Sequence, residues 1–203
     1  AIATDTPQPT VTMADTPTHI VSSTPTSILK SVTGADCIPN HPVQTGKVVD
    51  VVDGDTIKVQ MDQDGRTYTI RYIGMDTPEY TSQVEYFGSE AAVENVRLVM
   101  GKTASLIKDV SETDRYGRLL RYVIVDGIFV NYELVARGFA NTASFPPDIA
   151  CIPAFQGAEQ KAKTAALGLW NAPPAATPIP TVVPVTGGGG GGNAPCTCNG
   201  PDL

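Results

Sequence analysis

Three Asp-Gly pairs divide the middle of the chain into short runs of β-branched and aromatic residues. Asp53-Gly54 lies between GKVVDVV and TIKVQM, Asp64-Gly65 precedes YTIRYIG, and Asp126-Gly127 lies inside LLRYVIVDGIFV. Asp-Gly between two such runs is a strong signal for a tight turn that joins antiparallel strands. With TASLIKDV as one more strand, the pattern predicts five short strands.

Helical patterns follow the third strand and the last one. The segment SEAAVENVRLVMG predicts a helix with Ser89 as its N-cap and Gly101 as its stop. NYELVARGFA predicts a short helix that ends near Gly138, and AFQGAEQKAKTAALGLW predicts a last helix. The apolar stripe expected to face the core in the first of these helices consists of Ala92, Val93, Val96, Val99 and Met100.

This order of elements indicates the fold class. Five strands with one helix inserted after the third, followed by C-terminal helices, are typical of a closed five-stranded antiparallel barrel of the OB type. The expected class is therefore mainly β with helices (α+β), and closure would remove the exposed edges of short strands. An open α+β sheet built from the same elements is the alternative.

Proline and glycine mark the two ends of the chain, which has 203 residues with 17 prolines and 19 glycines. Residues 1–36 are rich in threonine, serine and proline and predict a disordered stalk before a folded domain over 37–172. Residues 173–193 predict a Pro/Gly-rich linker, and 194–203 form a cysteine-containing tail that could begin a truncated further module.

The expected location is outside the cell. Thr/Ser/Pro-rich stalks usually occur there, although an ordinary disordered tail has the same composition. The chain begins at Ala1 and has neither a signal-peptide core nor an apolar segment long enough to span a bilayer. We therefore expect a mature or trimmed product that is secreted or tethered to the cell surface through its stalk.

Four cysteines are compatible with that location. Cys37 and Cys151 lie at the start and near the end of the expected domain, which favours a disulfide between them over two free thiols. Cys196 and Cys198 form a C-x-C pair that could bind a metal or begin a second disulfide module.

The charge of the chain limits the classes of partner. The formal net charge is −7, and residues 45–170 carry 13 basic and 17 acidic side chains, so the chain lacks the basic surface of a general nucleic-acid binder. A polyanion would have to be held locally by a few placed cations. With only two histidines, zinc clusters and histidine acid–base chemistry are disfavoured.

An acidic constellation follows the third strand. Asp55 after an Asp-Gly turn, and Asp76 at a strand end, mean little by themselves. Pro78, however, holds Thr77 extended, so that the Asp76 carboxylate and the Thr77 carbonyl could face one point. Two carboxylates and a carbonyl form a hard oxygen site that suits Ca²⁺ or Mg²⁺ and does not suit zinc or copper.

Arginines supply the complementary charge. Arg71 is five residues from Asp76, so strict strand alternation would send the two side chains to opposite faces, and Gly74 is the expected break. The loop DRYGR, residues 114–118, by itself predicts a solvated hairpin loop. If it folds over the carboxylates, Arg118 joins Arg71 as a second guanidinium for a phosphate group.

These segments together resemble the staphylococcal nuclease-like (thermonuclease) family. The resemblance covers about residues 45–170 and depends on VVDGDTIKV, IRYIGMDTPE, DRYGRLLRYV, VNYELVARGFA and GLW in this order. It implies an OB-fold barrel and a phosphodiesterase that uses one Ca²⁺ ion and cuts DNA and RNA to products ending in 3′-phosphate. The implied roles are calcium binding for Asp55, Asp76 and the Thr77 carbonyl, phosphate binding for Arg71 and Arg118, and water activation for Glu79.

The segment YTSQVEYFG after Glu79 is shorter than in the family and lacks its lysines, and the loop after Ala140 lacks the tyrosines expected beside a nucleotide. Tyr116 remains a candidate to pack on the sugar or base, with Arg115 as a further substrate-binding candidate. We expect a monomer that favours single-stranded or locally melted DNA and RNA. The alternative function is a catalytically weak, nucleic-acid-binding module on a cell-surface stalk.

Overall fold

The computed structural model describes residues 31–80 and 85–171. Residues 1–30 of the expected stalk, the expected linker (173–193) and the expected tail (194–203) lie outside these described residues. The two interpretations of the tail cysteines, metal binding or a second disulfide, therefore stay predictions.

The folded domain begins earlier than the composition suggests. Residues 31–36, which we assigned to the stalk, include Val32 and Ala35, and both side chains are buried in the hydrophobic core. The prediction that the stalk extends to residue 36 is therefore wrong, because burial of these two side chains anchors the segment just before Cys37.

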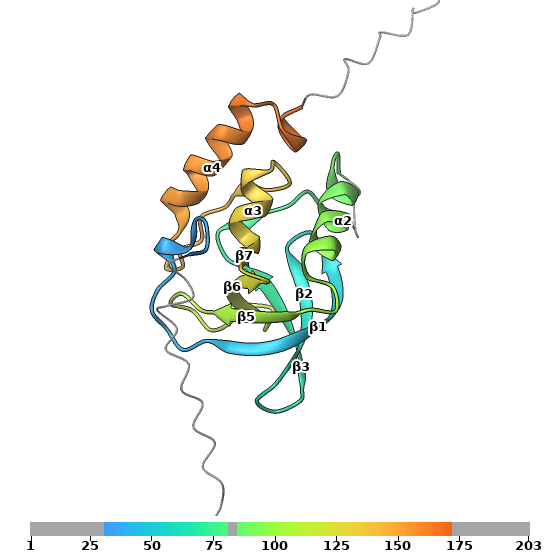
Figure 1. Ribbon diagram of the computed structural model, residues 1–203, viewed down its shortest axis with the longest axis vertical. Helices are drawn as coiled ribbons and strands as arrows, with labels where there is room; N and C mark the ends of the chain where they lie inside the picture. The colour runs from blue at the N-terminus through green and yellow to red at the C-terminus, as the bar shows by residue number, and fades with distance from the viewer. Residues whose placement is uncertain (1–30, 81–84, 172–203) are drawn as a thin grey trace, which may run out of the picture. The chain divides into compact units, whose positions relative to one another are not determined.

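Five strands form the closed barrel that the element order predicts (Figure 1). Neighbouring strands pair in the order β3-β2-β1-β5-β6, and a parallel pairing of β3 with β6 closes the ring. This pairing excludes the open sheet that the sequence left as an alternative. The barrel strands are β1 (Gln44–Asp53), β2 (Thr56–Met61), β3 (Thr67–Tyr72), β5 (Thr103–Ile107) and β6 (Leu119–Val125).

The turns between paired strands lie where the Asp-Gly pairs predict them. Gly65 and Gly127 have φ angles of +68° and +75°, in the left-handed region that glycine adopts at little cost. After the second of these turns, β7 (Ile128–Phe129) pairs with β6. Outside the barrel, β4 (Met75–Asp76) pairs with β8 (Asn141–Thr142).

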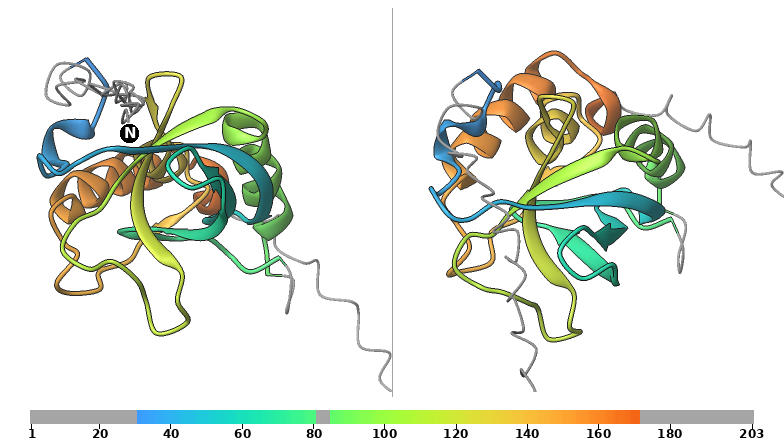
Figure 2. Two further views of the ribbon diagram at one scale, coloured as in Figure 1. Left: turned by 90° about the horizontal axis from the view of Figure 1, so that it is seen from below. Right: turned by 60° about the horizontal axis from the view of Figure 1, so that its bottom comes forward.

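Within the described residues, three α-helices accompany the barrel: α2 (Gly88–Val99), α3 (Val130–Ala136) and α4 (Ile152–Thr164). Figures 1 and 2 show α3 between the other two at one end of the barrel. The last helix is shorter than we expected, because Gly168–Trp170 forms a separate 3-10 turn, η2, after α4 has ended. None of the helices in the described residues is long and apolar enough to cross a bilayer.

The expected N-cap of α2 is wrong, and of the expected apolar stripe only Val99 is buried. The N-cap is Phe87, with a φ of 71°, and Ser89 lies inside the helix. Val93 is 68% exposed, whereas the polar Asn95 is completely buried. The Asn95 amide donates to the Asp53 carbonyl at 2.8 Å and accepts from the Tyr72 hydroxyl at 2.9 Å. Because a buried polar group is tolerated when it is hydrogen-bonded, these partners decide which face of α2 packs on the barrel.

A disulfide joins Cys37 to Cys151 across 114 residues, as the cysteine positions favour. It connects the 3-10 turn η1 (Ala35–Cys37) to the residue before α4. The Cys151 side chain is fully buried beside Phe155 in the hydrophobic core. The crosslink therefore ties the entry of the domain to the helix that covers the end of its barrel.

Replacing Cys37 and Cys151 by serine should destabilise the domain by about 2–5 kcal/mol, because the crosslink restricts a long loop in the unfolded chain. Thermal unfolding of the double variant and of the oxidised wild type measures the effect. The wild type treated with a reductant should unfold at the same temperature as the double variant. Equal melting temperatures for oxidised and reduced protein would contradict the expectation.

Candidate active site

The end of β3 brings Arg71 and Asp76 together. The strand stops at Tyr72, and Gly74 turns the chain with a φ of +80° before β4 begins. A Cβ on Gly74 would lie 2.4 Å from the ring of Phe155, so close packing also requires glycine here. The predicted break in strand alternation is confirmed, and the Arg71 guanidinium forms an ion pair with Asp76.

Asp55 is the most buried carboxylate of the cluster, with 1% exposure. It pairs with Arg71 and accepts hydrogen bonds from the Thr56 hydroxyl at 2.9 Å and the Thr77 main-chain N–H at 3.2 Å. Burial raises the pKa of Asp55, and the guanidinium acts against this. One guanidinium shared with Asp76 does not offset the full desolvation of Asp55, so a further cation beside it would be stabilising.

Arg71 itself is firmly charged. Burial alone would lower the pKa of its guanidinium, but the neighbouring Asp55 and Asp76 carboxylates outweigh burial and raise it. The same side chain therefore holds two carboxylates close together whose mutual repulsion would otherwise separate them.

Thr77 lies against the turn that carries Asp55. Its side chain fills the space above Gly54, where an added Cβ would be 2.7 Å from Thr77 Oγ1. That Oγ1 atom is buried and has no hydrogen-bond partner within the described residues. The residue expected to offer its carbonyl to a cation thus lies beside Asp55, and its side-chain oxygen is a further uncommitted oxygen there.

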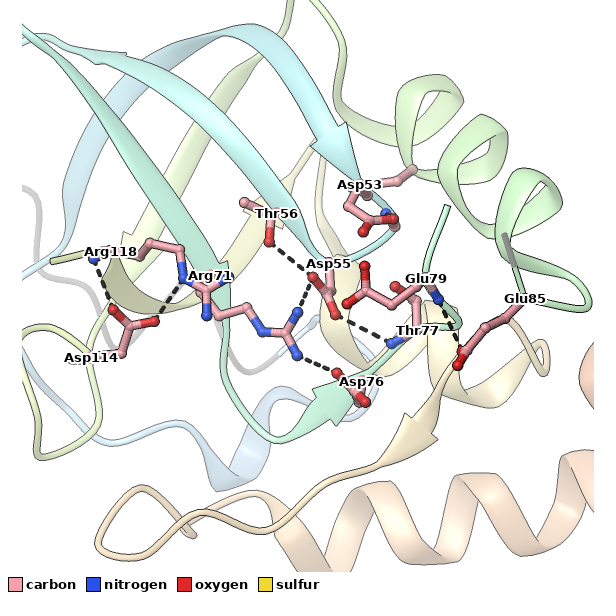
Figure 3. Close-up of polar contacts among 12 residues, drawn as sticks. Asp53, Asp55, Thr56, Arg71, Asp76, Thr77, Glu79, Glu85, Asp114 and Arg118 are labelled. Carbon is pink, nitrogen blue, oxygen red and sulfur yellow. Dashed lines mark hydrogen bonds and ion pairs between the residues drawn. The ribbon is translucent and has the colours of Figure 1, made fainter. Parts of the chain in front are cut away.

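Glu79 completes the carboxylate cluster, which also includes Asp53, a residue that the sequence analysis did not single out. The Glu79 carboxylate lies beside Asp55, and Asp53 lies close by at the end of β1 (Figure 3). Partial desolvation raises the pKa of Glu79, and the charges of Asp53, Asp55 and Asp76 raise it further. The D-G-D spacing was the available signal for Asp53, which we interpreted only as part of a turn.

Arg118 lies apart from these carboxylates. Its loop enters β6, whose Leu120 pairs with Arg71 of β3. The Arg118 Nε donates to Asp114 Oδ2 at 2.7 Å, and in Figure 3 Arg71 lies between this pair and Glu79. Asp114, which the sequence analysis did not identify as functional, therefore holds the arginine. Burial alone would raise the Asp114 pKa, but hydrogen bonds from Arg118 and Tyr116 lower it.

The exposed ring of Tyr116 is flanked by two guanidinium groups. The Cζ atoms of Arg115 and Arg118 lie 4.7 Å and 5.5 Å from its centre. Arg115 also donates to the Tyr116 hydroxyl at 2.6 Å. The three side chains form a basic, aromatic surface next to β3, which is a suitable surface for a nucleotide.

The donor set fits a hard cation in chemistry, although the side chains are not arranged as a closed metal site. No group of three or more His, Cys, Asp or Glu side chains among the described residues is positioned to hold a metal ion. In this arrangement the Arg71 guanidinium is paired with both Asp55 and Asp76. Carboxylates, a carbonyl and a hydroxyl nevertheless are the ligand types that Ca²⁺ and Mg²⁺ prefer.

Comparison with known protein families shows which family the chain belongs to. The sequence model of the family described as "Staphylococcal nuclease homologue" matches residues 69–172. The chain belongs to this family. The match includes Arg71, Asp76, Glu79 and Arg118, and it begins after the turn that carries Asp55.

Several curated relatives are nucleases by name. A thermonuclease of Staphylococcus hyicus is 34% identical over 137 residues, which cover 66% of this chain and 80% of that protein. The SPbeta prophage-derived endonuclease YokF of Bacillus subtilis is 40% identical over 125 residues, or 59% of this chain and 42% of that protein. Endonuclease YncB of the same organism is 38% identical over 141 residues, which cover 64% of this chain and 66% of that protein. The chain thus spans less than two thirds of either Bacillus subtilis relative.

Replacing Arg71 by glutamine should destabilise the protein by about 3 kcal/mol, because Asp55 then stays buried without its cation. Urea unfolding at neutral pH measures this. Asp55→Asn together with Arg71→Gln should lose less than the sum of the two single variants, since the pair interacts directly. Additive effects, or an Arg71→Gln variant as stable as the wild type, would show that the ion pair does not hold the site.

Proposed function

We propose that this domain is a hydrolase of the staphylococcal nuclease type that cleaves phosphodiester bonds of DNA and RNA with the help of calcium and leaves 3′-phosphate ends. The observation that carries the proposal is the convergence of Asp55, Asp76 and Glu79 around the Arg71 guanidinium. Membership of the family and the nuclease names of the relatives support it.

Asp55, Asp76 and the Thr77 carbonyl would hold the calcium ion. When bound, such an ion lowers the pKa of water and neutralises charge on a phosphate. The burial of Asp55 supports this assignment, because a second cation would further stabilise a buried carboxylate that shares one guanidinium with Asp76.

Glu79 would act as the general base. Its carboxylate lies at the edge of the cluster and is exposed, so that water can reach it. Its pKa is higher than that of an ordinary glutamate, and a more basic carboxylate takes a proton from water more readily. The proton moves from water to Glu79 as the oxygen attacks phosphorus. The bond from phosphorus to the 5′ oxygen of the next nucleotide breaks, and that oxygen takes a proton from solvent and leaves as a hydroxyl group.

Arg71 and Arg118 would stabilise the charge that grows on the phosphate oxygens during attack. The Nε atom of Arg118 is engaged by Asp114, whereas its two terminal nitrogens donate no hydrogen bond within the described residues. Those nitrogens form the flat edge of the guanidinium that binds two phosphate oxygens at once. Tyr116 and Arg115 would contact the adjoining sugar or base.

The proposed substrate is single-stranded or locally melted nucleic acid, because a chain with net charge −7 can hold a strand only through a few local contacts. We further propose that the protein acts as a monomer outside the cell, where the Cys37–Cys151 disulfide would persist.

Heat-denatured DNA incubated with the full chain should be degraded in calcium and remain intact in a chelator. Glu79→Gln should abolish cleavage while the protein stays folded, because an amide cannot take the proton. End-group analysis of the products should give 3′-phosphate. Binding of the DNA without calcium-dependent cleavage would favour the alternative of a nucleic-acid-binding module, and cleavage by Glu79→Gln at the wild-type rate would reject the general base.

Arg118→Ala should lower kcat by about 10²–10³-fold, the range seen when one preorganised transition-state donor is removed. The KM should change much less, since this contact strengthens as charge develops on the phosphate. Steady-state kinetics with a short single-stranded substrate separate the two constants. A raised KM with an unchanged kcat would instead assign Arg118 to ground-state binding.

A further inference from the structure

Both main-chain polar groups of Glu79 are bonded to one other residue. The Glu85 N–H donates to the Glu79 carbonyl at 2.9 Å. In return, the Glu79 N–H donates to the Glu85 carboxylate, at Oε2, at 3.1 Å. Figure 3 shows the Glu85 side chain reaching back to the Glu79 backbone. A pair of bonds in opposite directions restrains both the position and the orientation of the Glu79 peptide groups.

The first residue of α2 closes the space behind Glu79. A Cβ on Gly88 would lie 2.4 Å from the Glu79 carbonyl oxygen, 3.0 Å from its carbonyl carbon and 3.1 Å from the Pro78 oxygen. These are main-chain atoms, so no side-chain rotation could relieve the contact. The Gly88 N–H also donates to the Glu85 carbonyl at 3.1 Å, which connects Glu85 to the start of the helix.

The same helix is attached to the other side of the site. Asn95, two turns along α2, donates to the carbonyl of Asp53 and accepts from the buried Tyr72 hydroxyl. Asp53 belongs to the turn that presents Asp55, and Tyr72 follows Arg71 in β3. One helix therefore contacts the Glu79 backbone at its start and the carboxylate-bearing turn in its middle.

We propose that Glu85 is a positioning residue that, together with Gly88, fixes the main chain of Glu79 relative to the Asp53–Asp55 turn. The inference rests on the proposed role of Glu79 as general base. Glu85 itself is exposed, and its carboxylate bonds to the main chain of Glu79 and not to the Glu79 carboxylate. Its effect on the reaction is exerted through Glu79, because a base displaced by about 1 Å can lose on the order of 10²-fold in rate.

Glu85→Ala should lower kcat by about 10- to 100-fold and leave KM within about threefold, since it misplaces the base without removing a phosphate contact. Glu85→Gln keeps an acceptor oxygen for the Glu79 N–H and should recover most of the rate. In the alanine variant, hydrogen exchange of the Glu79 amide should become faster. Equal kcat in Glu85→Ala and wild type, or no rescue by glutamine, would overturn the inference.

Gly88→Ala tests the same restraint without touching a charge. The φ angle of Gly88 is not in the left-handed region and the residue is helical, so alanine suits its backbone and favours the helix. Only the contacts with the Glu79 and Pro78 main-chain atoms oppose it, and the kcat of the folded variant should fall.

The matched control is Gly157→Ala in α4, where an added Cβ meets nothing within 4 Å. Its kcat should equal that of the wild type. If Gly88→Ala also keeps the wild-type kcat, the proposed restraint is wrong.

The wild type and Glu79→Gln separate this inference from the proposed function. If the wild type does not cleave nucleic acid, the proposed function fails, and amide exchange at Glu79 still reports whether Glu85 holds its backbone. If the wild type cleaves and Glu79→Gln does not, unchanged kinetics in both Glu85→Ala and Gly88→Ala would refute the positioning role alone.

Discussion

The ion pairs of Arg71 with Asp55 and Asp76 are the interaction on which the site depends. Without the Arg71 guanidinium, the Asp55 and Asp76 carboxylates would repel each other, and the buried Asp55 would resist ionisation. The pairs form only because β3 stops at Tyr72 and Gly74 turns the chain, which brings Asp76 to the side of the strand that Arg71 occupies. A local backbone break thus creates the charge arrangement.

Helix α2 has a larger part in the site than its sequence suggests. Its buried face includes Asn95, bonded to Tyr72 and to the Asp53 carbonyl, and its start lies against the Glu79 backbone. An apolar face would pack equally well on the barrel but would not define the position of the turn so narrowly. The buried amide gives up hydration and in return links the helix to the residues beside the carboxylates.

The charges of the candidate site lie in two neighbouring regions, the acidic cluster and the Asp114–Arg118 pair. Arg71 belongs to the first, and the Tyr116 ring with its two flanking guanidinium groups belongs to the second. The parallel pairing of β3 with β6 places the two regions side by side. This arrangement suits the proposed substrate, in which a phosphate group and the adjoining nucleotide need separate contacts.

Local sequence was enough to predict the hairpin turns, the five strands and the break at Gly74, because turn chemistry and strand alternation act over a few neighbouring residues. The Asp-Gly pairs and the segment from Arg71 to Glu79 therefore pointed to the barrel and to most of the carboxylate cluster. The packing of the folded chain was needed to learn which polar groups are buried and what each one contacts. The exposed face of α2, the inclusion of Asp53 and the contact of Glu85 with Glu79 all depend on groups supplied by other segments, and their desolvation cannot be judged until those segments are packed.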